Sequence, residues 1–95
     1  MRSYTIVLYS EPEGGYSVAV PALPGCATEG ETVSEAKRMA REAIELHLEC
    51  LADHGQRLPN DVRSFKMQLG QSGRASAYRI QVHEPILAPS AASLA

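Results

Sequence analysis

The chain has 95 residues and a mass of 10.3 kDa, which is room for one small domain with a thin hydrophobic core. Its formal net charge of −2 at pH 7 argues against nonspecific binding to nucleic acid, because contact with phosphates needs a concentrated positive field. No apolar run approaches the roughly 20 residues of a membrane span, the first residues lack the pattern of a signal peptide, and two cysteines are too few for a disulfide framework, so we expect a cytoplasmic protein.

The first third of the chain predicts a β-hairpin followed by a short strand. Segment 3–10 (SYTIVLYS) is rich in β-branched and aromatic residues, and every second side chain faces the same side. Segment 11–15 (EPEGG) is typical of a turn, since proline fixes φ and the two glycines accept positive φ. Segment 16–20 (YSVAV) alternates again and completes the hairpin. The Pro-Gly pair at 24–25 marks a second turn, after which residues 26–29 form only a short third strand.

The clearest predicted element is a helix that begins after Thr32 and runs to about His54. Thr32 and Glu35 have the spacing of a capping box, in which each side chain accepts a hydrogen bond from a main-chain N–H at the helix start. Gly55 is a natural stop. Helical periodicity turns one stripe toward the sheet, and its alanines predict that the helix lies close against it. The stripe consists of Val33, Ala36, Ala40, Ala43, Ile44, His47 and Leu51.

Beside this stripe, three further apolar residues form a shoulder on the same helix. They are Met39, Leu46 and Cys50. One face of a sheet does not cover both the stripe and the shoulder, and an exposed apolar surface commonly marks a site of association. We therefore expect at least a homodimer, with part of the shoulder or a C-terminal strand in the interface.

After the helix the alternating pattern of strands returns. Segments 65–69 (FKMQL) and 78–82 (YRIQV) alternate apolar and polar residues, and 71–76 (QSGRAS) is typical of a loop. The expected architecture is β-β-β-α-β(-β), an α+β two-layer fold with an antiparallel sheet packed on one long helix. The sequence leaves open which C-terminal segment supplies the fourth strand. We expect a single domain over residues 1–83 and a poorly ordered tail over 84–95, which is rich in proline and small residues.

Several motifs with fixed spacing occur together between residues 14 and 59. They are GGYSVAVPALPGC at 14–26, GETVSEA at 30–36, EAI at 42–44, Gly55 and Pro59. Together they resemble the pattern of the HicB-like antitoxin family, type II toxin–antitoxin proteins that also occur as small stand-alone UPF0150-type proteins. The resemblance covers roughly residues 3–60 and implies a partial, degenerate RNase H-like fold. It also implies binding to a HicA-like toxin, a small basic protein of double-stranded-RNA-binding fold that cleaves messenger RNA, which the antitoxin neutralises by covering its surface.

The chain departs from many members of that family in its last third. Those members carry a C-terminal ribbon-helix-helix or helix-turn-helix module that binds their own operator, whereas residues 61–95 contain neither an amphipathic helix pair nor a basic cluster. We therefore expect no specific DNA binding. Two functions remain open: a non-catalytic antitoxin that neutralises a HicA-like toxin, and a stand-alone homo-oligomeric binding module without a toxin partner.

Acidic side chains gather in the loops around the predicted hairpin, at Glu11, Glu13, Glu29 and Glu31. They are open to two interpretations: solvated turn residues that keep the protein soluble, or an acidic rim that meets a basic toxin and speeds its docking. The partner-binding surface that we expect comprises Tyr16, Leu23, Glu29 and Glu31.

No residues of the sequence predict catalysis, a metal site or a cofactor. A working RNase H-type site needs carboxylates that converge on metal ions, one of them near the middle of the first strand, where segment 6–8 reads IVL. His47, Cys50 and His54 share one side of the helix, but zinc usually needs a fourth ligand, and roles in packing and helix termination explain them more simply. Three carboxylates of the predicted helix are expected on the outer face of the helix as surface charges: Glu42, Glu45 and Glu49. We expect that the protein is not an enzyme.

Overall fold

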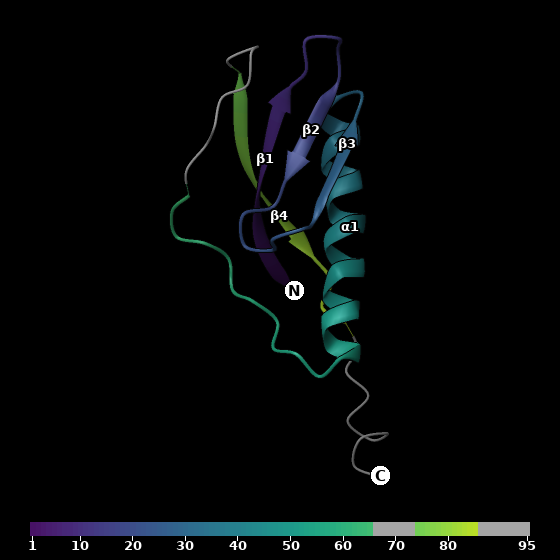
Figure 1. Ribbon diagram of the computed structural model, residues 1–95, viewed down its shortest axis with the longest axis vertical. Helices are drawn as coiled ribbons and strands as arrows, with labels where there is room; N and C mark the ends of the chain where they lie inside the picture. Colours follow the sequence, from purple (N-terminus) through teal and green to yellow (C-terminus); the bar gives the residue numbers. More distant parts are fainter. Residues whose placement is uncertain (66–73, 86–95) are drawn as a thin grey trace.

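The computed structural model describes residues 1–65 and 74–85, which form one helix packed on a four-stranded sheet (Figure 1). The elements are β1 (Arg2–Ser10), β2 (Tyr16–Ala19), β3 (Ala27–Gly30), α1 (Val33–Asp53) and β4 (Ala75–Val82). The order across the sheet is β3-β2-β1-β4, and all three neighbouring pairs are antiparallel. The expected α+β fold, an antiparallel sheet packed on one long helix, is confirmed.

The hydrophobic core lies between α1 and one face of the sheet. The central strand β1 presents Tyr4, Ile6 and Leu8 to this core, as its alternation predicts. The helix contributes four fully buried residues: Ala36, Ala40, Ile44 and Leu48. The predicted stripe omitted Leu48 and included His47, which is only half-buried. Periodicity gives the spacing of a helical stripe, but tertiary contact decides which of two neighbouring positions points straight at the sheet.

Both ends of α1 are capped as the sequence predicts. The hydroxyl of Thr32 accepts a hydrogen bond from the N–H of Glu35 at 3.0 Å, and the carboxylate of Glu35 accepts one from the N–H of Glu31 at 3.1 Å. At the other end, Gly55 has a φ of 69°, and its N–H donates to the carbonyl of Ala52 at 3.0 Å. In the part of the chain that the structure describes, no helix is long and apolar enough to cross a membrane.

The fourth strand is β4, which answers the question that the sequence left open. It begins at Ala75, inside the segment 71–76 that was expected to be a loop, and it pairs along its whole length with β1. Phe65, the first residue of the other predicted strand, has no strand structure, and residues 66–69 lie outside the described residues. Most of the tail expected at 84–95 also lies outside them.

The segment that follows α1 is tied to the first half of β1 by hydrogen bonds. β2 pairs with β1 only from Val7 onward, so the earlier part of β1 needs other partners on that side. The carboxylate of Asp61 accepts two bonds from Thr5, one from its N–H and one from its hydroxyl, each at 2.8 Å. The phenol of Tyr4 donates to the carbonyl of Pro59. These contacts supply hydrogen-bond partners to the start of β1, which does not pair with β2.

Two side chains of α1 reach across to β4 at the edge of the sheet. The Nε of Arg41 donates to the carbonyl of Gln81 at 2.9 Å, and the carboxylate of Glu45 accepts from the N–H of His83 at 2.8 Å. Both bonds join the helix layer to main-chain groups of the sheet layer. Glu45 therefore has a structural task and is not a simple surface charge.

Candidate functional site

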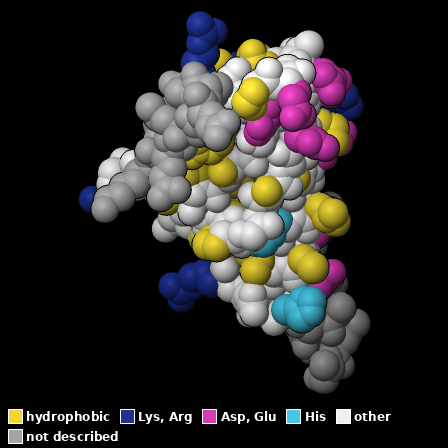
Figure 2. Space-filling view, turned by 45° about the horizontal axis from the view of Figure 1, so that its top comes forward, with side chains coloured by type: hydrophobic (Ala, Val, Ile, Leu, Met, Phe, Trp, Pro, Cys, Tyr) yellow, Lys and Arg dark blue, Asp and Glu magenta, His cyan; other side chains and the backbone are white. Residues whose placement is uncertain are grey.

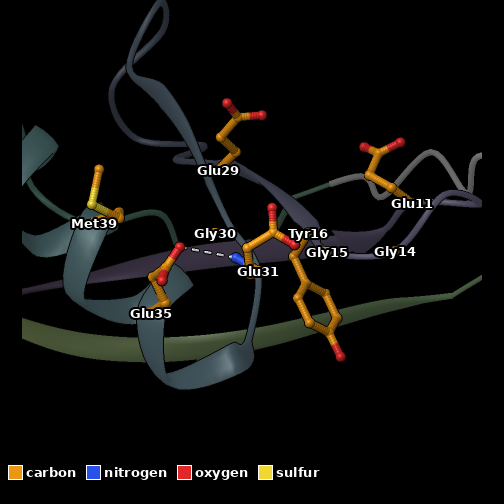
Figure 3. Close-up of a pocket in the computed structure, with 9 residues that line it drawn as sticks. All are labelled: Glu11, Gly14, Gly15, Tyr16, Glu29, Gly30, Glu31, Glu35 and Met39. Carbon is orange, nitrogen blue, oxygen red and sulfur yellow. Dashed lines mark hydrogen bonds between the residues drawn. The ribbon is translucent and has the colours of Figure 1, made fainter.

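Loops at one end of the sheet and the start of α1 surround an acidic hollow of about 290 Å³. Figure 2 shows acidic side chains gathered on this end of the molecule, and Figure 3 shows the residues around the hollow. The β1–β2 turn, the end of β3 and the first two turns of α1 contribute its lining. The lining residues are Glu11, Gly14, Gly15, Tyr16, Glu29, Gly30, Glu31, Glu35 and Met39.

Two glycines allow these elements to come together. Gly15 has a φ of 79°, and a Cβ at this position would lie 3.2 Å from the carbonyl oxygen of Gly30. Gly30 itself is buried at the end of β3, where a Cβ would lie 2.5 Å from the main-chain nitrogen of Ala36. A side chain at Gly30 would push the helix away, so glycine lets α1 begin directly against β3. This close start places Glu29 and Glu31 beside the first turn of the helix.

The four carboxylates around the hollow are not equivalent. The Oε1 atom of Glu35 accepts the hydrogen bond from the N–H of Glu31, drawn as a dashed line in Figure 3. Glu35 is thereby held in the first turn of α1, where the helix dipole favours negative charge. Glu11, Glu29 and Glu31 are exposed and come from the loops and from β3. These three carboxylates are the ones available to a cationic partner.

Three of the four expected partner-binding residues lie together at the hollow: Tyr16, Glu29 and Glu31. Tyr16 is half-buried against the core, and its ring points away from the carboxylate of Glu29 (Figure 3). Leu23 requires a correction, because it is 1 % exposed and packs in the core. The turn around it, closed by the bond from the N–H of Cys26 to the carbonyl of Leu23 at 2.9 Å, leaves its side chain no surface to offer. Partner binding by the other three residues stays a prediction.

Sequence reasoning did not identify every residue of the hollow. Glu35 and Met39 also line it, although Glu35 was expected only as a helix cap and Met39 only in an interface between two copies of the chain. The capping box could have indicated Glu35, because a carboxylate at this position always lies beside the loop that precedes the helix. Glu13, which the sequence grouped with the other acidic loop residues, is exposed but is not part of the lining.

A second hollow, of about 310 Å³, lies between α1 and the start of β3. Leu46 and Cys50 of the predicted shoulder line it, and Leu46 is 67 % exposed. The rest of the lining is Gly25, Cys26, Ala27, Ala43 and His47. Met39, the third residue of the shoulder, lies at the acidic hollow instead. Association of two chains through this shoulder stays a prediction.

Several titratable side chains along α1 make local contacts. His47, Cys50 and His54 border one further hollow, but Nδ1 of His54 lies 2.7 Å from the carbonyl oxygen of Cys50 and bonds to it. Among residues 1–65 and 74–85, no three or more His, Cys, Asp or Glu side chains are grouped so that they could hold a metal ion. The carboxylates diverge as well, because Glu42 forms an exposed ion pair on the helix surface whereas Glu45 bonds to the chain after β4.

Comparison with known proteins adds the relationship of this chain to others. Residues 4–82 match the family described as the HicB_like antitoxin of bacterial toxin-antitoxin system. A UPF0150 protein of Thermoplasma acidophilum is 43 % identical over 58 residues, which are 61 % of this chain and 84 % of that protein. The N-terminal domain of the antitoxin HicB of Burkholderia pseudomallei superposes with a TM-score of 0.66 at 25 % identity, covering 85 % of this chain and 98 % of that domain. A chain of the HicA3 and HicB3 toxin-antitoxin complex has a TM-score of 0.60 at 20 % identity, over 85 % of this chain and 98 % of that chain, which shows likeness of fold alone. With most of its length matched, the chain belongs to the HicB-like antitoxin family.

Proposed function

We propose that this protein is the antitoxin of a toxin–antitoxin pair and that it neutralises a HicA-like toxin by covering the toxin's surface. The observation that carries the proposal is the match of residues 4–82 to the antitoxin family. The likeness of fold to a chain in a HicA3 and HicB3 complex is consistent with it, because a fold of this kind occurs there with a toxin. The proposed partner is a small basic protein, as the resemblance of the sequence implies.

The acidic hollow supplies a physical reason for such a pairing. Glu11, Glu29 and Glu31 are exposed around one hollow although they lie in two separate regions of the sequence. Acidic groups gathered on one surface attract a basic protein, orient it and raise its rate of association. We therefore place the first contact of the toxin at this end of the molecule.

Neutralisation by coverage needs no catalytic group on the antitoxin. Val7 in the middle of β1 is 1 % exposed and lies between the buried Ile6 and Leu8, so core side chains fill the part of the strand where an RNase H-type site has a carboxylate. An interface requires only a packed patch of apolar and polar groups. We expect purified protein with magnesium or manganese to leave single-stranded RNA and RNA–DNA hybrid uncut.

The proposal is tested by co-expression with a toxin candidate, which we expect the adjacent reading frame to encode as a small basic protein. Production of that protein alone should arrest growth, and co-expression with this chain should restore it. The two chains should also remain together through gel filtration at physiological salt. Failure of the two proteins to associate, or the lack of such a neighbour, would refute the proposal.

Charge reversal tests the contact surface. The double variant Glu29→Lys with Glu31→Lys should lower the association rate constant about tenfold at low salt, since it inverts the local field. It should also reduce the dependence of that rate on salt concentration. Glu35 is left unchanged because it caps α1. The double variant Glu49→Lys with Asp53→Lys is the matched control, because it makes the same change in charge at two exposed positions of α1 outside the hollow. Equal effects of both changes would mean that net charge acts and this surface does not.

The second hollow supports one alternative function, a stand-alone homo-oligomeric binding module without a toxin partner. Its apolar lining and the exposed Leu46 are features of association sites in general. This alternative gains if no neighbouring toxin binds. In both cases we expect no specific DNA binding, and a gel shift with promoter DNA that random DNA competes poorly would contradict this.

A further inference from the structure

β3 forms one edge of the sheet. It stands at the end of the order β3-β2-β1-β4 and pairs with β2 on its inner side. The residues of an antiparallel strand bond alternately toward one neighbour and toward the other. The N–H of Ser10 donates to the carbonyl of Arg74 on the β4 side, so odd-numbered residues of β1 bond toward β2, and the register carries this alternation to β3. The main-chain N–H and C=O groups of Ala27 and Glu29 therefore point outward from the sheet edge.

These outward groups are open to another chain. Among residues 1–65 and 74–85, no hydrogen bond reaches the outward main-chain groups of Ala27 or Glu29. The next outward N–H, that of Glu31, is closed by the carboxylate of Glu35 at 3.1 Å. Two successive open residues on an edge are a template for an added strand, because an extended chain presents its own partners at the same spacing of two residues.

Two hollows border the open edge of β3, one at each end. The hollow of about 310 Å³ lies beside Ala27, and the acidic hollow of about 290 Å³ lies beside Glu29. α1 lines both hollows as well, with Leu46 at the first and Met39 at the second. Figure 2 shows acidic side chains at one end of the molecule and hydrophobic side chains further along the same face. A chain that lies along β3 thus meets an apolar surface at one end and negative charge at the other.

We infer that β3 binds an extended peptide segment as an additional antiparallel strand, and that this segment carries a basic residue followed by apolar residues one and three positions later. The basic residue stands directly opposite Glu29, because opposite charges stabilise a cross-strand pair. Glu29 is exposed, and Figure 3 shows that its carboxylate points away from Glu35, which caps the helix. The carboxylate of Glu29 is therefore accessible from the strand edge.

The apolar positions follow from the face that each residue of β3 presents. Thr28 lies opposite the core residue Val18, so its side chain faces α1, and so do the peptide residues opposite Thr28 and Cys26. These two peptide residues lie toward the hollow at Leu46 and bury apolar surface there. The peptide residue between them stands opposite Ala27 and faces away from α1, where a polar side chain is accommodated.

An extended peptide fits this edge better than other occupants do. A helix engages its own main-chain groups and would leave those of Ala27 and Glu29 unpaired. Antiparallel pairing with β3 of a second copy about Thr28 sets Ala27 of that copy opposite Glu29, so no cation meets the carboxylate, and the threonine of that copy faces the hollow in place of an apolar side chain. The inference goes beyond the proposed function and does not depend on it, because the peptide alone carries the required chemistry.

Titration of the peptide acetyl-TKLTLS-amide into the ¹⁵N-labelled full chain, followed by nuclear magnetic resonance, is the first test. Its lysine stands opposite Glu29, and its two leucines face α1. At about 1 mM peptide, the amide signals of Ala27 and Glu29 should shift, and their hydrogen exchange should slow because both N–H groups gain acceptors. The amide signals of Ala77 on β4, at the other edge of the sheet, should stay in place.

Methylation of the peptide main chain separates strand addition from attraction by charge. The middle threonine stands opposite Ala27, and its N–H donates to the carbonyl of that residue. Methylation of this nitrogen should weaken binding at least tenfold. The N–H of the first leucine points away from β3, so methylation of that nitrogen is the matched control and should change the affinity less than twofold.

Substitutions in the protein test the two side-chain contacts. Glu29→Lys should weaken binding of TKLTLS about tenfold, since an attractive cross-strand pair becomes repulsive, and it should bind TELTLS more tightly than the unchanged protein does. Glu49→Lys makes the same change in net charge at an exposed position outside both hollows and should change the affinity less than twofold. Leu46→Ala should weaken binding about threefold without lowering the melting temperature, because Leu46 is largely exposed.

Each contrary result overturns the inference. Unchanged signals at 1 mM peptide would mean that β3 accepts no strand, and shifts confined to β4 would place the peptide at the other edge. Equal affinities of the two methylated peptides would mean that the main chain of β3 does not bind the peptide. No arm contains a toxin, so failure of a toxin to associate refutes the proposed function alone, and failure of the peptide to bind refutes this inference alone.

Discussion

Replacing Asp61 by alanine removes the acceptor of two hydrogen bonds that hold the segment after α1 against β1. The carboxylate of Asp61 accepts from the N–H and the hydroxyl of Thr5, each at 2.8 Å. Thr5 is 9 % exposed and precedes the part of β1 that pairs with β2, so its N–H has this side chain as its partner. Arg79 lies 3.5 Å from the same carboxylate but is 69 % exposed.

The cost of Asp61→Ala follows from these contacts. A buried donor that loses a charged acceptor costs about 1–3 kcal/mol, and Thr5 has two such donors. The exposed Arg79 adds little, because solvent screens a surface ion pair. Since the side chain of Asp61 is itself 16 % exposed, water can replace part of the loss. We expect the free energy of unfolding to fall by about 3 kcal/mol.

Urea unfolding followed by circular dichroism measures this loss. With an m-value of about 1–1.5 kcal/mol/M for a small domain, the midpoint should fall by about 2–3 M. All variants are measured at the same protein concentration as the unchanged protein, because association of folded chains would make the apparent stability depend on concentration. Asp53→Ala, which removes an exposed carboxylate at the end of α1, should change stability by less than about 0.5 kcal/mol. A loss at Asp61 as small as that at Asp53 would refute the reasoning.

Three further outcomes follow from burial in the core. Burial raises the pKa of the Cys26 thiol, so a maleimide at pH 8 should label the exposed Cys50 well before Cys26, and equal labelling by mass spectrometry would contradict this. Burial also raises the pKa of the Tyr4 phenol above its unfolded value of about 10, so folding disfavours the ionised form. The free energy that the neutral Tyr4 phenol contributes to folding is present below about pH 10 and is lost as the pH rises toward the folded pKa. The decline in unfolding free energy from pH 9 to 11 should therefore be smaller in Tyr4→Phe than in the unchanged protein. Equal declines in the two proteins would contradict this assignment. Gly30→Ala places a Cβ 2.5 Å from the nitrogen of Ala36 and should lower the free energy of unfolding by about 3 kcal/mol, whereas a melt like that of the unchanged protein would show that α1 can move aside.

Local signals predicted the elements of the fold well. Thr32, Glu35 and Gly55 gave the ends of α1, because capping acts over a few residues and is visible in the sequence. The alternation of β1 gave the face that meets the helix, because side chains of a strand alternate whatever it packs against. Elements whose signals are local could thus be placed by their own residues alone.

Features that depend on contact between distant segments could not be predicted in this way. Leu23 lies in a short turn, where the sequence suggests an exposed side chain, but this side chain is buried in the core. Asp61 lies in a segment without periodicity, and its tie to Thr5 spans 56 residues of sequence. The acidic hollow was anticipated in part, through Glu29 and Glu31, whereas the contribution of Glu35 depends on the close start of α1 at Gly30. Tertiary packing decides such positions, and sequence patterns do not record it.

The reach of Arg41 and Glu45 over the edge of β4 has a consequence for how the protein behaves when crowded. The N–H of Ser10 donates to the carbonyl of Arg74, just before β4. In an antiparallel pair, the main-chain N–H and C=O groups of even-numbered residues of β4 therefore point toward β1, and those of odd-numbered residues point outward. The two helix side chains thus occupy outward main-chain groups at the end of β4. An edge strand with open groups is a template on which another chain can add a strand and begin a fibril. Here the helix that builds the core also closes the end of this edge, so growth of the sheet from one molecule into the next is hindered there.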